Sequence, residues 1–114
     1  MNPFDLQGHK ALVTGANTGL GQAIAVGLAR AGAEVICAAR RDCDETLAQI
    51  AAVGGRGGFQ PLDFADPMAA SGLFEGAGYS ILVNNAGIIR RADSVAFTEA
   101  DWDDVIDVNL KAVF

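Results

Sequence analysis

A glycine-rich stretch near the start of the chain has the residue types that bind anions. This stretch is 14–21, which follows the short apolar run 10–13 and leads into a segment of helical composition, 22–29. Glycine lets a backbone turn sharply and approach a ligand closely, and the N–H groups at a helix N-terminus attract negative charge. A strand, this turn and a helix in that order predict a cradle for a phosphate group.

The spacing of the glycines differs from two common nucleotide motifs. Gly15, Gly19 and Gly21 are spaced G-x-x-x-G-x-G, whereas the dinucleotide fingerprint is G-x-G-x-x-G, and no Gly-Lys-Ser/Thr ending of a P-loop follows. Asn17 and Thr18 add side chains that can hydrogen-bond a ribose or a phosphate. The alternative is a glycine-rich turn between a strand and a helix that binds nothing.

The elements that must position this loop follow from the periodicity of the apolar residues. Strands are predicted at 10–14, 34–39, 58–62 and 80–83, and helices at 20–31, 43–53, 66–75 and 99–114. This alternation predicts an α/β fold, the N-terminal half of a Rossmann-type doubly wound parallel sheet with helices on both faces. Ligands bind such sheets at the carboxyl ends of the strands, so we expect the loops 15–19, 39–42, 63–66 and 84–91 to converge there.

Three boundaries carry specific signals. Gly32 follows the first helix and can supply a left-handed cap. Pro61 indicates a start, a bulge or an edge-like position in the third strand, because proline has no N–H for a ladder bond. Thr98 followed by Asp101 resembles a capping box with aspartate in place of glutamate, which predicts a helix start.

The composition argues against several classes of partner. The 114 residues carry 14 acidic and eight basic side chains, for a formal net charge of −6, which would repel a nucleic-acid backbone. No apolar run approaches the roughly 18 residues of a membrane span, and residues 1–5 lack the features of a signal peptide. We therefore expect one cytoplasmic domain, 1–114, with no nucleic-acid or membrane partner.

The residues that most often bind metals have no metal-site pattern here. Cys37 and Cys43 are too few for a disulfide scaffold and lack ligand spacing, and Cys37 is expected to fill space in a buried strand. His9 has no partner in sequence. The aspartates of 101–107 fall in the first turns of a helix, where they offset the helix dipole. The sequence predicts no metal site.

Four motifs taken together resemble those of the short-chain dehydrogenases/reductases. They are the glycine motif, Leu62-Asp63, Asn84-Asn85-Ala86-Gly87 and Val108-Asn109-Leu110, in the order and spacing of that family. The resemblance covers essentially the whole chain. Segments 84–93 and 101–105 look more narrowly like the 2-deoxy-D-gluconate 3-dehydrogenase branch, also called 2-dehydro-3-deoxy-D-gluconate 5-dehydrogenase. Another nucleotide-binding α/β enzyme, such as a methyltransferase, would not explain 85–87 or Asn109.

The resemblance implies a nicotinamide cofactor and a role for individual residues. The pyrophosphate and the adjoining ribose would lie against Gly15, Asn17, Thr18, Gly19, Leu20 and Gly21. Asp63 would accept from the adenine amino group with Phe64 beside it, and Asn85, Ala86 and Gly87 would line the ribose side. Asn84 would bond backbone between strands. Asn109 is implied as a catalytic residue that holds a water in the proton relay behind the family's lysine.

The residues after the second strand bear on the choice between NADP and NAD. NAD-preferring members carry an acid there, which bonds the ribose hydroxyls and repels a phosphate. Here Ala39 has that position and Arg40 and Arg41 follow, and a guanidinium pairs with phosphate through a bidentate fork. The sequence therefore predicts NADP, with NAD as the alternative if the arginines merely lie in solvent. Asp42 and Asp44 could still reach the adenosine ribose.

The resemblance also implies hydride transfer to or from the hydroxyl or keto carbon of a sugar acid such as 2-deoxy-D-gluconate. Arg90 and Arg91 could bind the carboxylate of that small-molecule substrate or simply balance the acidic helix beyond. The family's Tyr-x-x-x-Lys pair is not in this sequence, because Val83 stands four residues after the single tyrosine, Tyr79.

That pair and the catalytic serine would lie after residue 114, so the resemblance implies the N-terminal portion of an oxidoreductase. The family forms homo-oligomers, and a dimer or tetramer is implied for the longer protein. The alternative is a non-catalytic nucleotide-binding fragment or an inert truncated remnant.

Overall fold

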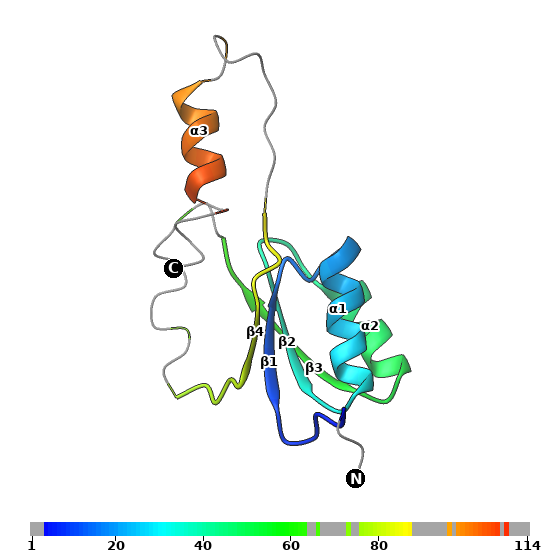
Figure 1. Cartoon of the computed structure of the whole chain (residues 1–114). Helices are drawn as coiled ribbons and strands as arrows, with labels where there is room; N and C mark the ends of the chain where they lie inside the picture. Colours follow the sequence, from blue (N-terminus) through cyan, green and yellow to red (C-terminus); the bar gives the residue numbers. More distant parts are fainter. Residues whose placement is uncertain are drawn as a thin grey trace.

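A four-stranded parallel sheet is the centre of the computed structural model, which describes residues 4–63, 66, 73, 76–87, 96, 98–107 and 109. The strands are β1 (Lys10–Thr14), β2 (Glu34–Ala39), β3 (Arg56–Pro61) and β4 (Ile81–Val83). They lie in the order β3-β2-β1-β4, and every neighbouring pair is parallel (Figure 1). The predicted α/β class with a Rossmann-type parallel sheet is confirmed.

The strand order creates a switch point between β1 and β4. From β1 the chain moves outward through β2 to β3, and it then returns to the other side of β1 as β4. Ala11 pairs with Ile81 and Val13 pairs with Val83, so β1 and β4 end at nearly the same level. Ligands of open α/β sheets bind in the crevice outside such a switch point. The turns that follow Val13 and Val83 are therefore the expected place for a ligand.

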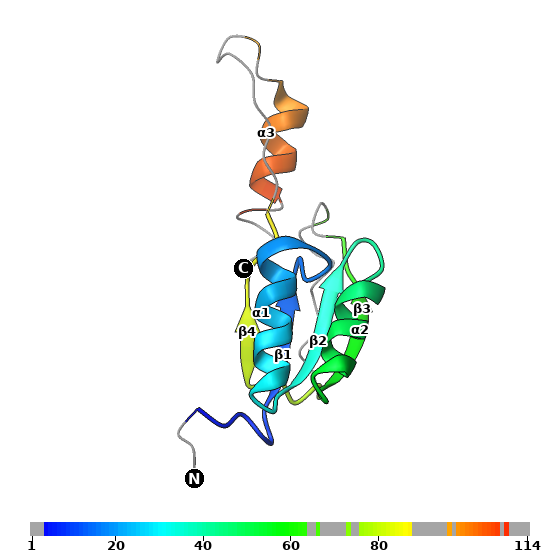
Figure 2. The same cartoon turned by 90° about the vertical axis from the view of Figure 1, so that its right-hand side faces the viewer.

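Three helices accompany the sheet: α1 (Gly19–Arg30), α2 (Asp44–Ala52) and α3 (Glu99–Ile106). Figure 2 shows α1 and α2 side by side on one face of the sheet, whereas α3 stands away from it in both views and has no buried residue. Most of the predicted helix 66–75 lies outside the described residues, as does most of 107–114. In the part of the chain that is described, no helix combines the length and apolar character needed to cross a membrane.

Two apolar clusters occupy the two faces of the sheet. The larger lies under α1 and α2 and includes Val13, Ala25, Ala29, Val35, Cys37 and Ile50. The smaller, on the other side, contains Leu12, Ala38 and Leu62, with Ile36, Leu73 and Tyr79 packed against it. Successive side chains of a strand point to opposite faces, so Leu12 and Val13 are both buried, at 1% and 0% exposed. This double burial is typical of a central parallel strand.

The first two helices both end in a left-handed glycine. Gly32 has φ +109°, its N–H donates to the Ala29 carbonyl at 3.0 Å, and the N–H of Ala33 donates to the Leu28 carbonyl at 3.1 Å. These two bonds form a Schellman motif, and the predicted cap is confirmed. Gly54, with φ +76°, ends α2 in the same way.

The third strand begins two residues earlier than predicted. The expected range was 58–62, which leaves Arg56 and Gly57 outside the strand. A Cβ on Gly57 would lie 3.0 Å from Leu47 Cδ2, so the glycine lets α2 pack closely on this strand. Pro61 is the last residue of β3 at the edge of the sheet, where its missing N–H costs no ladder bond. The predicted edge-like position is confirmed.

Candidate functional site

The passage from β1 into the first residue of α1 contains two glycines in the left-handed region. Gly15 has φ +63° and Gly19 has φ +60°, values that other residues adopt at a steric cost. A Cβ added to Gly19 would meet no atom within 4 Å, so this part of the loop faces open space. The backbone here is accessible to a ligand, as a phosphate cradle requires.

Gly21 is needed for a different reason. It is buried, and a Cβ at this position would collide with the carbonyl oxygen of Gly15 and with Nδ2 of Asn85. The missing side chain lets the first turn of α1 lie against the beginning of its own loop. The absent side chain of Gly21 thus allows the helix to contact the loop, while the absent side chain of Gly19 leaves open space for a ligand.

The hydroxyl of Thr14 joins the loop to the turn after β4. It donates to the Val83 carbonyl at 3.2 Å and accepts from the N–H groups of Asn85 and Ala86 at 2.9 and 3.0 Å. This uses the one donor and both acceptor sites of a hydroxyl. Asn85 Nδ2 adds a bond to the Gly15 carbonyl at 3.2 Å. The two turns at the switch point are therefore held together as one unit.

The N-terminus of α1 is electrostatically open. Its N-cap residue, Thr18, makes no side-chain capping bond, and the first turn contains no acidic residue. In α3 the equivalent threonine, Thr98, accepts from the Asp101 N–H at 3.0 Å, and both Glu99 and Asp101 lie in the first turn. The threonine half of the predicted capping box is confirmed there. At α1 the uncapped N–H groups and the positive end of the dipole favour an anionic ligand.

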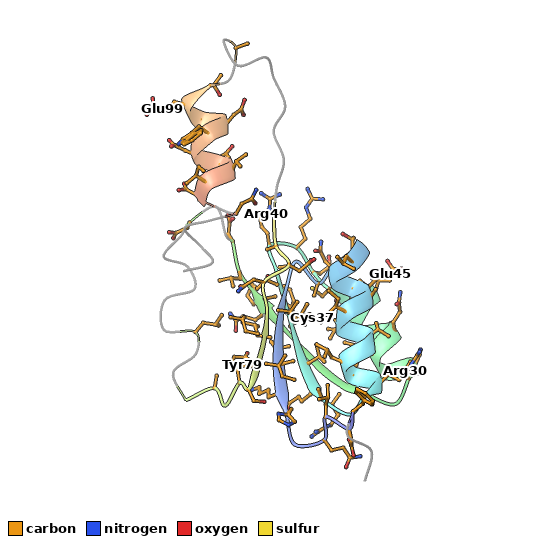
Figure 3. The ribbon with its side chains drawn as sticks, viewed as in Figure 1. Arg30, Cys37, Arg40, Glu45, Tyr79 and Glu99 are labelled. Atoms are coloured by element: carbon orange, nitrogen blue, oxygen red, sulfur yellow. The ribbon has the colours of Figure 1, made fainter. Side chains whose placement is uncertain are left out.

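A pair of arginines follows β2 at this end of the sheet. Ala39 ends the strand, and Arg40 and Arg41 are exposed beyond it. Figure 3 shows Arg40 at the end of the sheet where α1 begins. Asp42 Oδ1 accepts from the Asp44 N–H at 3.3 Å, so this carboxylate supports the start of α2. The arginine pair therefore stands at the same end of the sheet as the glycine loop.

The structure brings some of the remaining predicted residues together. A Cβ on Gly87 would lie 3.2 Å from Oδ1 of Asn109, so these two residues are neighbours. Asp63 is exposed just past the carboxyl end of β3, and Leu20 is 70% exposed at the start of α1. Asn17 is half-buried and Asn84 is exposed. Phe64, Arg90 and Arg91 lie outside the described residues.

Comparison with known proteins agrees with this arrangement. The family model of the short chain dehydrogenases matches residues 9–114. The chain belongs to the short chain dehydrogenase family. It is 45% identical over 119 aligned residues to a 2-dehydro-3-deoxy-D-gluconate 5-dehydrogenase of Dickeya dadantii, and the match covers 100% of this chain and 47% of that relative.

Two solved structures extend the likeness to three dimensions. An Agrobacterium tumefaciens protein, provisionally described as a 2-deoxy-D-gluconate 3-dehydrogenase and containing bound NADP, matches with a TM-score of 0.97 at 71% identity, over 100% of this chain and 46% of that one. A Beutenbergia cavernae protein, provisionally described as an NAD(P)-dependent gluconate 5-dehydrogenase with NADP at low occupancy, gives 0.89 at 42% identity, over 97% and 47%. The chain spans about half the length of the relatives it matches.

The single tyrosine of this short chain dehydrogenase sequence lies at the other end of the sheet. Tyr79 precedes β4, and its ring centroid is 5.0 Å from Nζ of Lys10, the first residue of β1. Figure 3 shows it far from Arg40. Burial, with a smaller contribution from the Glu34 carboxylate, raises the pKa of Tyr79, whereas proton transfer near neutral pH needs a lowered one. Tyr79 is thus part of the packing beneath β1 and β4.

The other groups considered as chemical candidates are structural. Cys37 is fully buried, as predicted, and burial raises the pKa of its thiol from 9.0 to about 12. Cys43 is also buried and its pKa is also raised, chiefly by desolvation. His9 has a partner that the sequence did not reveal, since Nδ1 lies 2.9 Å from Ser80 Oγ. Within the described ranges, no group of three or more His, Cys, Asp or Glu could hold a metal.

Sequence reasoning missed two threonines of the site. Thr14 ends a strand directly after the apolar residues 11–13, and Thr46 lies four residues before the buried Ile50 on the inner face of α2. Both are almost fully buried, at 3% and 0% exposed. A polar residue at a position where the pattern calls for an apolar one was the available signal, because buried hydroxyls are nearly always hydrogen-bonded.

Proposed function

We propose that this chain forms the NADP-binding half of an oxidoreductase acting on a CH–OH carbon of a sugar acid such as 2-deoxy-D-gluconate. The observation that carries the proposal is the uncapped N-terminus of α1 behind an open glycine loop at the β1/β4 switch point. Family membership, the names of the relatives, and NADP bound in two similar structures support it.

The described residues fit the phosphate groups of a dinucleotide cofactor. Open space beside Gly19 and the anion-favouring end of α1 suit a pyrophosphate, and the exposed guanidinium of Arg40 suits a 2′-phosphate. We assign the pyrophosphate and the adjoining ribose to Gly15, Asn17, Thr18, Gly19, Leu20 and Gly21. We assign the adenine side to Asp63 and Phe64, the other ribose side to Asn85, Ala86 and Gly87, and a proton-relay water to Asn109.

The bound cofactor would supply the hydride acceptor or donor, and the residues of this chain would bind and orient it. The bonds of Thr14 and Asn85 hold the two turns together without help from a ligand. A preformed site spends little free energy on ordering when the ligand arrives. We therefore favour a site that is already formed before the cofactor binds over a loop that becomes ordered only around its ligand.

In this proposal the proton-transferring residues follow Phe114. A second candidate function, nucleotide binding without catalysis, is favoured by the position of Tyr79 at the opposite end of the sheet from Arg40. The coding sequence beyond Phe114 separates the two. A downstream serine and Tyr-x-x-x-Lys would support the oxidoreductase, and a stop codon directly after Phe114 would support the binding protein.

Calorimetric titration with NADPH and NADH tests the cofactor assignment. We expect NADPH to bind more tightly, and Arg40→Ala to weaken NADPH by about tenfold or more without affecting NADH, because a charge-assisted bond is lost. Arg30→Ala is the matched control, since Arg30 is exposed in the last turn of α1, at the other end of the sheet (Figure 3). Tighter binding of NADH would favour NAD, and no binding of either cofactor would refute the proposal.

A further inference from the structure

A chain of hydrogen bonds connects α2 to the outer part of the glycine loop. The hydroxyl of Thr46 donates to the Ala16 carbonyl at 2.7 Å and accepts from Gln22 Nε2 at 3.0 Å. Gln22 Nε2 also lies 3.4 Å from the Asn17 carbonyl, and Gln49 Nε2 donates to Gln22 Oε1 at 3.4 Å. Side chains of two helices thus hold two successive carbonyls of the loop.

The stability of α2 does not explain the presence of a threonine at position 46. Threonine has a lower helix propensity than alanine or leucine, and in a helix its hydroxyl usually bonds its own preceding turn. Here the side chain is fully buried and donates instead to a loop 30 residues away. In the described ranges the only buried polar side chains are Thr46 and Thr14, and both bond this loop or its neighbouring turn.

The direction of the carbonyls determines the direction of the N–H groups. In a planar trans peptide the C=O and the N–H point in opposite directions, and no peptide bond among the described residues is cis. The Ala16 carbonyl points toward Thr46, so the N–H of Asn17 points away from α2. The Asn17 carbonyl faces Gln22, so the N–H of Thr18 points away from Gln22. Among the backbone bonds of the described residues, neither N–H is a donor.

We propose that Thr46 and Gln22 are positioning residues, which aim the N–H groups of Asn17 and Thr18 at the pyrophosphate of the cofactor. This inference rests on the proposed function and deepens it. Thr46 contacts no cofactor itself; it acts through the loop.

The test compares ligands that do and do not contain a pyrophosphate, in the protein that carries this chain. Thr46→Val keeps the shape and removes the hydroxyl, while Thr46→Ser keeps the hydroxyl. We expect Thr46→Val to raise the Kd for NADPH about five- to tenfold, as for a lost buried hydrogen bond, and to leave the Kd for 2′-AMP unchanged. Thr46→Ser should restore most of the NADPH affinity.

The outcomes are distinguishable. If the wild type does not bind NADPH, the proposed function fails. If the wild type binds and Thr46→Val binds equally well, or loses 2′-AMP to the same extent, the positioning role is wrong and Thr46 is merely structural. If Thr46→Val does not fold, Gln22→Met decides instead, because Gln22 is only half-buried and methionine has a similar shape. We expect about a two- to threefold rise in the Kd for NADPH, as for a longer and only partly buried bond, and an unchanged Kd would overturn the proposal.

Discussion

Alanine substitutions at two glycines of α1 should change stability in opposite directions. Gly21 and Gly27 lie in the same helix, and neither has a positive φ. A Cβ on Gly27 would meet nothing within 4 Å, whereas a Cβ on Gly21 would collide with the Gly15 carbonyl oxygen. Because the residue type, the helix and the substitution are the same, the comparison isolates the contact between the helix and its loop.

The expected magnitudes follow from these surroundings. In a helix interior alanine is more favourable than glycine by roughly 1 kcal/mol, so Gly27→Ala should stabilise the protein by up to about this amount. Gly21→Ala has at most the same intrinsic gain, because Gly21 lies in the first turn of the helix. It must also displace backbone, since overpacking costs roughly 1–3 kcal/mol, and it breaks the Asn85–Gly15 bond at a cost of about 1 kcal/mol. We expect a net destabilisation of about 1–3 kcal/mol.

Urea denaturation followed by far-ultraviolet circular dichroism gives both values from the shift in midpoint at constant m. Gly21→Ala should also weaken NADPH binding, because the first turn of α1 can no longer approach Gly15. Equal stability of the two variants would refute the reasoning. It would mean that the loop moves away from the added methyl group at negligible cost, and that Gly21 does not shape the site.

Three further results are expected. Thr14→Val should cost about 2–4 kcal/mol in urea denaturation because three hydrogen bonds of a buried hydroxyl are lost, and Thr14→Ser should recover most of it; a loss below about 0.5 kcal/mol would contradict this. Thr98→Ala should cost about 1 kcal/mol whereas Thr18→Ala should cost almost nothing, since only Thr98 caps its helix, and equal losses would argue against an open α1 N-terminus. The raised pKa of Cys37 favours the neutral thiol in the folded state, so its contribution to stability is full below pH 9 and is lost as the pH rises toward about 12. Cys37→Ala should therefore show a shallower loss of stability over this range than the wild type, and identical slopes would exclude the effect.

Local signals were sufficient to predict most of the fold. The apolar runs of β1 and β2 identify strands buried on both faces, and Gly32 marks the end of α1, because each depends on neighbours in sequence. The start of β3 was predicted wrongly for the opposite reason. Whether Gly57 interrupts a strand or lets a helix approach depends on Leu47, which reaches it from α2. That contact is tertiary and leaves no mark in the local pattern.

In the candidate site, too, the residues with a local signal could be predicted and those that depend on tertiary contacts could not. The glycines of the loop and the turn at 85–87 stand out in the sequence, since few other residues tolerate such backbone geometry. The hydroxyls that hold them do not stand out. Thr14 bonds groups that lie 69 to 72 residues away, and Thr46 bonds a carbonyl 30 residues away. A single threonine in an apolar pattern indicates only that some partner exists, and the fold decides which partner it is.

The four threonines of the chain show how the site is left open to a ligand. Thr14 and Thr46 are buried: Thr14 bonds the turn after β4 and Thr46 bonds the Ala16 carbonyl of the loop, while Thr98 caps its own helix. Thr18 is an N-cap residue that makes no side-chain capping bond, and its helix, α1, begins at the switch point. An anion site needs N–H donors that are not used within the protein, and it needs a loop that is already held in place. Donors with internal partners cannot bind the anion, and donors on an unsupported loop would first have to be ordered. In the proposed function, the support from Thr14 and Thr46 keeps the loop in place while the N–H groups at the start of α1 are available to the cofactor.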